Sequence, residues 1–162
     1  MHVEICTPAA VPDWLSLRHA LWPRTTAELH KAEIAAFLAR DHHAVAFIVR
    51  DATAAIGFAE ATLRHDYVNG CSTSPVAFLE GIYVRPEYRR RGAVRLLVGA
   101  VENWAIGLGC RELASDTELH NQLSQRVHAS LGFHETERIV CYLKRLPAAT
   151  PPGGDEPEGG RP

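Results

Sequence analysis

The chain has 162 residues, of which 46% are hydrophobic and 22% charged, so it is large enough to bury the core of one globular domain. The last 16 residues hold three of the 19 acidic and one of the 17 basic residues, which leaves a body with 16 charges of each sign. A neutral body argues against general nucleic-acid binding, and no segment has the length or apolar character of a membrane span.

Hydrophobic periodicity predicts alternating strands and helices along the body of the chain. Trp22-Pro23 separates the first two helices, because the residue before a proline resists helical geometry. A polar, turn-rich loop over residues 65–75 follows the expected hairpin of strands 44–50 and 55–64. The expected strands cover residues 2–6, 44–50, 55–64, 78–84, 112–116 and 134–144, and the expected helices cover 12–21, 25–38, 93–108 and 121–131.

Residues 147–162, PAATPPGGDEPEGGRP, hold five prolines, four glycines and no large apolar side chain. Such a segment cannot bury enough apolar surface to offset the entropy of ordering. We therefore expect one domain over residues 1–146, followed by a disordered tail over 147–162.

Cysteines and histidines are dispersed along the chain. Cys6, Cys71, Cys110 and Cys141 form no CxxC pair, so we expect reduced thiols and no metal site. The N-terminal residues, MHVEI, lack a basic and apolar leader, and this favours a cytoplasmic protein.

The stretch FLEGIYVRPEYRRRGAVRLLV, residues 78–98, predicts a strand, an arginine-rich turn and a helix. The first turn of a helix has N–H groups without partners and carries partial positive charge. Gly92 would let a pyrophosphate approach the backbone, and the arginines add fixed charge. This pattern indicates phosphate binding, although a basic, solvated helix start is the alternative. It is neither a Walker A loop nor GxGxxG.

The hexamer RRRGAV, residues 89–94, resembles the Q/R-x-x-G-x-G/A loop that binds the coenzyme A pyrophosphate in the GCN5-related N-acetyltransferase (GNAT) superfamily. Val94 departs from this pattern, since the family has Gly or Ala there, and we expect its branched side chain to crowd the pyrophosphate unless Ala93 lets the loop adjust. Longer blocks resemble the aminoglycoside 6′-N-acetyltransferases, which inactivate aminoglycoside antibiotics. These blocks are residues 22–23, 64–71, 74–75, 78–82, 109–112, 114–117 and 131–138.

The resemblance implies an α/β (α+β) fold, with a mixed central sheet flanked by helices and a splayed strand pair that forms the cofactor cleft. It also implies acetyl-CoA as co-substrate without a metal, an aminoglycoside as acceptor, and a homodimer formed through the C-terminal strands. As a lone residue, Asn121 is more often a helix N-cap. The cofactor-binding residues implied by the resemblance are Ile82, Tyr83, Val84, Arg90, Arg91, Gly92, Ala93, Val94, Arg95 and Asn121.

Glu80 is a carboxylate inside an apolar strand, on the same alternation as Phe78 and Ile82. Burial without a partner would be costly, so either an arginine or a substrate ammonium is expected to compensate it. The resemblance favours the ammonium. Asp116 ends the next strand and either caps the following segment or faces the acceptor from the opposite wall. Either carboxylate could accept the proton of the amine.

Three further residues complete the acceptor site by resemblance: Trp22, Tyr67 and Glu137. Carboxylates and aromatic rings suit a polycationic sugar, because each ammonium gains a carboxylate and the rings cover apolar sugar faces. The alternatives are core packing for Trp22 and a role as loop anchor for Tyr67.

His128 stands four residues before Gly132-Phe133, where many superfamily members have a tyrosine that protonates the leaving thiolate. An imidazolium could donate this proton, although a hydrogen-bonded histidine on a helix is the commoner case. None of the cysteines sits beside a base in any motif, so direct attack in a ternary complex is preferred to a covalent intermediate.

Two other functions remain open from the sequence. One is acetyl transfer to a different cationic amine, such as a polyamine or a protein N-terminus. The other is a non-catalytic acetyl-CoA-binding or antibiotic-binding module in which Val94 prevents productive cofactor binding.

Overall fold

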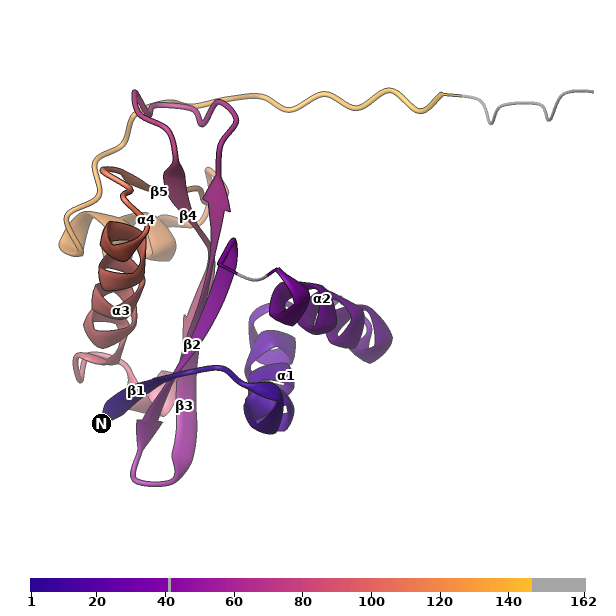
Figure 1. Cartoon of the computed structure of the whole chain (residues 1–162), viewed down its shortest axis with the longest axis vertical. Coiled ribbons are helices and arrows are strands. Elements are labelled where there is room, and N and C mark those ends of the chain that lie inside the picture. Colours follow the sequence, from indigo (N-terminus) through magenta and orange to yellow (C-terminus); the bar gives the residue numbers. More distant parts are fainter. Residues whose placement is uncertain (41, 147–162) are drawn as a thin grey trace, which may run out of the picture.

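The computed structural model describes residues 1–40 and 42–146, so the expected tail over 147–162 lies outside the described residues. A five-stranded sheet forms the centre, with α1 and α2 on one face and α3 on the other (Figure 1). No helix in the described ranges is long and apolar enough to cross a membrane. The strands are β1 (His2–Ile5), β2 (Ala44–Asp51), β3 (Ala54–Arg64), β4 (Val76–Val84) and β5 (Leu113–Ser115), and the helices are α1 (Val11–Leu21), α2 (Ala27–Ala39), α3 (Ala93–Gly107) and α4 (Gln122–Ser130), with short 3-10 helices at Pro8–Ala10 and Pro86–Tyr88.

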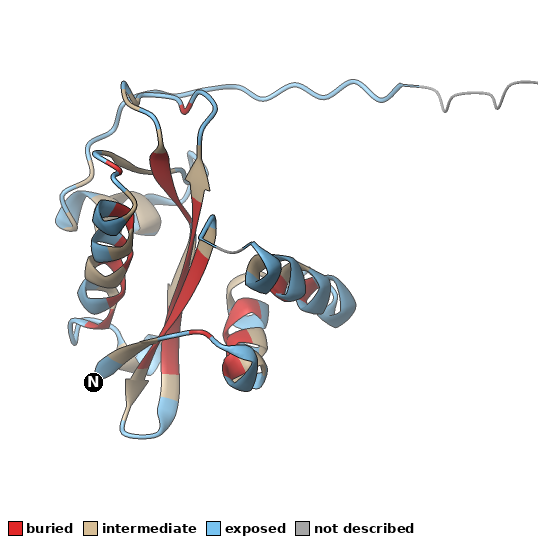
Figure 2. Cartoon of the chain, viewed as in Figure 1, coloured by how far each residue is buried: buried red, intermediate tan, exposed pale blue. Residues whose placement is uncertain are grey.

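Buried residues lie along the central strands and on the sides of the helices that face the sheet (Figure 2). Alternation along these strands divides the core between the two faces of the sheet. On β2, Phe47 and Val49 pack with Leu97 and Val101 of α3. The intervening Ile48 joins the cluster beneath α1 and α2, with Trp14, Leu17, Ile34 and Phe58. Because both faces are covered by helices, these strands are apolar on both sides, which explains their continuous hydrophobic runs.

The sheet is mixed, and its last two strands pair over a short distance. β1 to β4 are antiparallel neighbours, whereas β4 and β5 are parallel and pair only from Ala77↔Leu113 to Leu79↔Ser115. β4 then continues through residues 80–84, where no described strand lies on the β5 side. We call the point beyond Leu79 and Ser115, where the two strands part, the fork. The expected splayed pair is thus confirmed.

A β-bulge shifts the register of β4 against β3 at the fork. Glu60 pairs with Gly81 and Ala61 pairs with Leu79, so Glu80 is the extra residue. Glu80 and Gly81 both face α1, while Ile82 packs on the core cluster beneath α3. The expectation that Glu80 and Ile82 share a face is therefore wrong, because the bulge reverses the alternation between them.

The predicted closing strand over residues 134–144 is wrong for the single chain. Residues 134–146 form neither helix nor strand; they pass the loop before β4 at Thr136 and then run away from the body (Figure 1). Val140 and Tyr142 are 77% and 92% exposed. A strand needs a neighbour for its backbone hydrogen bonds and its apolar face, and this segment has none within the described part of the chain.

Candidate functional site

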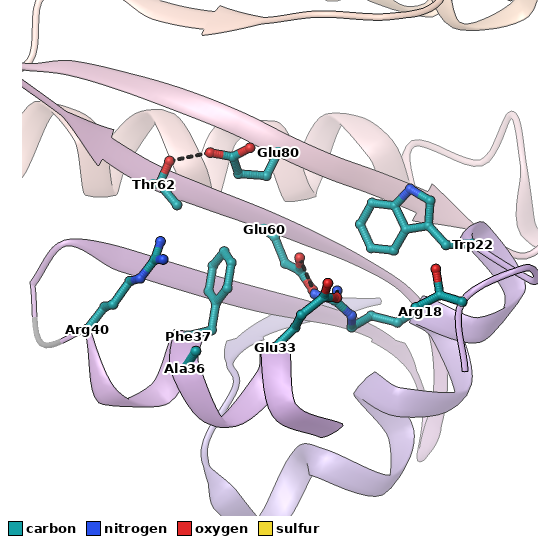
Figure 3. Close-up of a pocket in the computed structure, with 10 residues that line it drawn as sticks. Arg18, Trp22, Glu33, Ala36, Phe37, Arg40, Glu60, Thr62 and Glu80 are labelled. Carbon is teal, nitrogen blue, oxygen red and sulfur yellow. Dashed lines mark hydrogen bonds and ion pairs between the residues drawn. The ribbon is translucent and has the colours of Figure 1, made fainter. Parts of the chain in front are cut away.

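A cavity of about 450 Å³ opens between α1, α2 and the middle of β3 and β4 (Figure 3). It lies on the α1 side of the sheet, where the bulge directs Glu80. Three carboxylates and two guanidiniums contribute to its lining, beside aromatic rings, so it combines ionic and apolar surface. The charged residues of this lining are Arg18, Glu33, Arg40, Glu60 and Glu80, and the Trp22 ring lies beside them.

Glu80 faces this cavity and is already paired with an arginine. Arg64 Nη2 lies 2.9 Å from Oε1 and 3.1 Å from Oε2 of Glu80, and the Thr62 hydroxyl donates to Oε1. The Glu80 side chain keeps 29% of its surface exposed. Glu80 therefore has an arginine partner and is also accessible to solvent, and the cavity side of its carboxylate remains open to a ligand.

Asp116 directly follows β5 at the fork. The register that pairs Leu79 with Ser115 puts Asp116 one step beyond, level with Glu80 on the neighbouring strand. Its side chain is exposed, and no hydrogen bond or ion pair joins it to another residue in the described ranges. The capping alternative finds no support, because Asn121 caps α4. The fork thus brings one paired and one unpaired carboxylate to the same level.

Trp22 ends α1 and forms a wall of the cavity. Its ring lies 6.0 Å from the Phe58 ring in an edge-on arrangement, and the Arg18 guanidinium carbon lies 4.8 Å from its centroid. A Cβ added to Gly81 would come within 2.5 Å of Trp22 Cη2. Core packing and cavity lining are therefore both properties of Trp22, and the absence of a side chain at Gly81 makes room for the ring.

Replacement of Gly81 by alanine should displace the Trp22 ring and lower the free energy of unfolding by about 1–3 kcal/mol, because the added methyl overpacks this contact. Denaturant titration measures the loss, and a change in the tryptophan fluorescence, to which Trp22 contributes with Trp14 and Trp104, reports the displacement. Gly99→Ala is the matched control, since a Cβ there meets nothing within 4 Å and alanine favours the helix. Equal stability of the two variants would contradict the packing argument.

A buried ionic network beneath the cavity was missed by the sequence analysis. Glu60 is 2% exposed and accepts hydrogen bonds from Arg18 Nη1 at 2.6 Å and from Trp14 Nε1 at 2.5 Å. Burial raises the pKa of the Glu60 carboxyl, and the Arg18 ion pair opposes this shift. The available signal was the one used for Glu80, namely a carboxylate inside an apolar strand.

The same network reaches the cavity wall through Arg18. Another nitrogen of its guanidinium donates to Glu33, and Arg18 Nε donates to His30 Nδ1 at 3.3 Å. With Nδ1 as acceptor, His30 Nε2 carries the hydrogen and donates to the Trp22 carbonyl at 3.2 Å. Arg18 thereby holds Glu33 directly and supports Trp22 through both ring contact and His30.

Tyr67 and Glu137 do not line the cavity. Tyr67 is 78% exposed in the loop before β4, and Glu137 is exposed in the C-terminal segment. The two segments cross, since a Cβ added to Gly70 would lie 2.2 Å from Thr136 Oγ1. Both residues therefore belong to the same end of the molecule without joining Trp22 and Glu80.

On the α3 side, the turn at Gly92 is open. Gly92 caps α3 with φ 87, and a Cβ there would meet nothing within 4 Å. The N–H groups of Arg95 and Leu96 bond to the Gly92 carbonyl. The N–H groups of Ala93 and Val94 come before these two in the helix, so they have no intrahelical acceptor and point out of the N-terminal end of α3. Such a helix start fits a pyrophosphate.

Val94 does not block this turn, because its side chain packs against the core cluster beneath α3. The arginines nearby differ in how far they are engaged. Arg91 makes a long contact of 3.9 Å with Asp51 and lies over the Tyr88 ring, 5.6 Å from its centroid, and Arg95 donates to the Ser130 carbonyl at 3.3 Å. Arg90 adopts φ 59 and bonds to no other described residue. Positive charge therefore remains available around Gly92.

Ile82, Tyr83 and Val84 are the last residues of β4, in the part of the strand that extends beyond the fork. Because β5 ends at Ser115, this edge of β4 can offer backbone groups to an extended ligand. Asn121 caps α4, and its Oδ1 accepts a hydrogen bond from the Ser124 amide at 3.0 Å. The N-cap alternative is thus realised, and no residue in the described ranges accepts a hydrogen bond from the Asn121 side-chain NH2 group.

His128 of α4 is linked to the fork by hydrogen bonds. Its Nε2 lies 3.0 Å from Ser115 Oγ, and this hydroxyl donates to the Leu79 carbonyl at 3.2 Å. Nδ1 of the same ring lies 2.8 Å from the Ser124 carbonyl oxygen, which can only accept, so Nδ1 carries a hydrogen; Nε2 donates to Ser115 Oγ only when the ring carries hydrogens on both nitrogens. In that form His128 presents a proton at the parting of β4 and β5, where it can serve as an acid.

The thiols are poor nucleophiles where they are buried. Burial raises the pKa of Cys6, Cys71 and Cys110, so these thiols stay protonated at neutral pH. Cys141 lies in the exposed C-terminal segment, away from the cavity. Within the described ranges, no cluster of three or more His, Cys, Asp or Glu residues could hold a metal ion.

Comparison with known proteins gives consistent matches over the whole body. Residues 11–133 match the model of the acetyltransferase (GNAT) family. The chain is 52% identical over 145 residues to aminoglycoside N(6′)-acetyltransferase type 1 of Serratia marcescens, covering 89% of this chain and 99% of that protein. The protein of the same name from Acinetobacter baumannii is 44% identical over 146 residues, covering 90% and 99%.

Solved structures agree with these matches. AAC(6′)-Iy in complex with the bisubstrate analog CoA-S-monomethyl-acetylneamine superposes with a TM-score of 0.86 at 46% identity, covering 89% of this chain and 97% of that chain. An apo aminoglycoside 6′-N-acetyltransferase from Acinetobacter haemolyticus has a TM-score of 0.87 at 41% identity, covering 90% and 99%.

Proposed function

Because the chain belongs to the acetyltransferase (GNAT) family, we propose that it transfers acetyl from acetyl-CoA to the 6′-amine of aminoglycoside antibiotics and so confers resistance to them. The observation that carries the proposal is the fork, with the open Gly92 turn on one face of the sheet and the cavity of Glu80 on the other. The match to aminoglycoside N(6′)-acetyltransferases over the full body supports this choice of acceptor.

On the cofactor side, the amides of Ala93 and Val94 would hold the pyrophosphate, with charge supplied by Arg90, Arg91 and Arg95. Backbone groups of Ile82, Tyr83 and Val84 would pair with the pantetheine arm, and the Asn121 amide would donate to it. When bound, acetyl-CoA supplies a thioester whose carbonyl carbon accepts the amine.

On the acceptor side, Glu80 and Asp116 would bind the ammonium at the fork and accept its proton, directly or through water. Trp22 would cover an apolar face of the sugar. Tyr67 and Glu137 lie outside the cavity lining, and from there they would contact the outer part of the antibiotic. Attack is direct, in a ternary complex, because the described thiols near the sheet are buried and protonated.

His128 would protonate the departing thiolate through Nε2. We expect His128→Gln to lower kcat by about tenfold to a hundredfold, with little change in the KM for the antibiotic, since an acid acts only in the transition state. Steady-state kinetics test this. His120→Gln is the control, because His120 is an exposed histidine whose ion pair is with Glu118 alone. Equal kcat values for the two variants would remove His128 from the mechanism.

The decisive experiment combines the purified protein with acetyl-CoA and kanamycin, tobramycin or spermidine, and follows thiol release. Turnover with the two antibiotics is the expected result. Turnover with spermidine alone would identify an acetyltransferase for another cationic amine. Acetyl-CoA binding without turnover on any amine would identify a binding module.

We also propose that the protein is a homodimer and acts in the cytoplasm. The C-terminal segment supports the dimer, because it exposes Val140 and Tyr142, has no partner strand among residues 1–40 and 42–146, and can add to the sheet of a second copy. We expect the double variant Val140→Glu, Tyr142→Glu to be monomeric in light scattering. Ile106→Glu is the control, since Ile106 is exposed on α3. A monomeric unmodified protein would contradict the dimer.

A further inference from the structure

Arg64 is the last residue of β3, and within the described ranges it is the cation bonded to Glu80. One guanidinium nitrogen bridges both carboxylate oxygens, at 2.9 and 3.1 Å. The Thr62 hydroxyl donates to one of the same oxygens. The carboxylate expected to meet the acceptor amine is therefore neutralised in advance by a cation of the protein.

A ligand cation can take the place of Arg64 on part of the Glu80 carboxylate. The side chains of Arg64 and Glu80 are 39% and 29% exposed, and partly exposed pairs contribute little to stability. The Arg64 guanidinium carbon also lies 3.4 Å from the centroid of the Phe78 ring, a cation–π contact that does not depend on Glu80. Arg64 can thus release one Glu80 oxygen to an ammonium, while its contact with the Phe78 ring keeps the guanidinium beside the site.

The other charged groups around Glu80 do not duplicate Arg64. Arg18 is committed to Glu33 and Glu60. Neither Arg40, on the cavity wall, nor Asp116, at the fork, bonds to Glu80. Removal of the Arg64 charge would therefore leave Glu80 with the Thr62 hydroxyl as its remaining hydrogen-bond partner in the described structure.

We propose that Arg64 keeps Glu80 in a neutral pair so that the bound acceptor amine loses its proton more readily. This rests on the proposed function, in which the acceptor binds as an ammonium and reacts as a free amine. A lone carboxylate would bind the ammonium more tightly, and the same attraction would stabilise the protonated form. Arg64 is thus a positioning residue that lowers acceptor affinity and raises reactivity near neutral pH.

The test is the pH dependence of steady-state kinetics for Arg64→Met with kanamycin and saturating acetyl-CoA. We expect the KM for kanamycin at neutral pH to fall by roughly threefold to tenfold. The acidic limb of the kcat profile should move upward by about one pH unit, with kcat restored at alkaline pH. The shift has this direction whether the proton resides on the amine or on the carboxylate, because loss of a cation favours the protonated form of either.

Two control variants separate charge from shape. Arg64→Lys keeps the positive charge and should retain the unmodified profile. Lys31→Gln removes one positive charge from the exposed surface of α2, away from the cavity lining, and should change neither KM nor the profile. An unchanged KM and profile for Arg64→Met would overturn the proposal. A raised KM with kcat lowered at every pH would also overturn it, because that pattern indicates mere support of the Glu80 geometry.

Failure of the proposed function would be distinguishable from failure of this inference. If the protein acetylates another amine, the same pH profile is measured with that amine. If it acetylates none of them, the proposed function is wrong. Calorimetric titration with kanamycin then still compares the affinity of the unmodified protein with that of Arg64→Met. Tighter binding to Arg64→Met than to the unmodified protein supports the role of Arg64, and equal or weaker binding overturns it.

Discussion

Replacement of Glu80 by glutamine is expected to lower kcat/KM for an aminoglycoside by about two to three orders of magnitude. The variant keeps the size and the Thr62 contact of the side chain but loses the charge that attracts the ammonium and can accept its proton. Asp116→Asn should have a comparable effect, because Asp116 is the unpaired carboxylate at the fork. Steady-state kinetics with kanamycin measure both losses.

The cofactor provides an internal control for these two variants. The Gly92 turn lies on the α3 side of the sheet, so coenzyme A affinity measured by calorimetry should remain nearly unchanged. Glu102→Gln is the matched variant, since Glu102 is an exposed carboxylate on α3. Full activity in both Glu80→Gln and Asp116→Asn would show that the acceptor binds elsewhere.

Arg18→Met is expected to lower the free energy of unfolding by about 3–5 kcal/mol, because it leaves the buried Glu60 carboxylate without its guanidinium partner. Chemical denaturation measures the loss, and Arg126→Met on the exposed surface of α4 should change stability by less than about 0.5 kcal/mol. The double variant Arg18→Met, Glu60→Gln should regain part of the loss, since no uncompensated charge remains buried.

The effect of Arg18→Met should also depend on pH. Burial raises the pKa of Glu60 above the ordinary value of 4.5, and the loss of Arg18 removes the main influence that lowers it. The folded variant then binds a proton at Glu60 more tightly than the unfolded chain does. Its loss of stability is therefore largest at neutral pH and shrinks as the pH falls toward 4.5. A loss independent of pH would indicate that packing, not charge, is responsible.

Most elements were predictable because their signals are local. Trp22-Pro23 ends α1 by backbone sterics, and Thr26 caps α2 by accepting a hydrogen bond from the Leu29 amide. The 3.6-residue spacing of Leu97, Val98 and Val101 gives α3 its buried face. The prediction of a closing strand over residues 134–144 was wrong because strand pairing is not local. Its alternating pattern satisfies the intrinsic preference of a strand, but its hydrogen-bond partner is not supplied by the described residues of the same chain.

The candidate site was predictable in composition but not in its connections. A carboxylate in an apolar strand indicates that some group compensates it, and the pattern does not distinguish Arg64 from a ligand at Glu80. The same signal at Glu60 went unused, although this residue is the more deeply buried of the two. Pairings such as Arg18 with Glu60 join positions 42 residues apart, and only the packing of α1 on β3 brings them together.

By itself the sequence determined the strand, arginine-rich turn and helix around Gly92, since glycine geometry, helix starts and apolar spacing depend on neighbours within a few residues. The tertiary structure decided the β-bulge at Glu80, the packing of Val94 into the core and the ion pair between Arg64 and Glu80. Each of these depends on strand register and on side chains that approach from other elements. Such relations arise from long-range packing, which local periodicity does not encode.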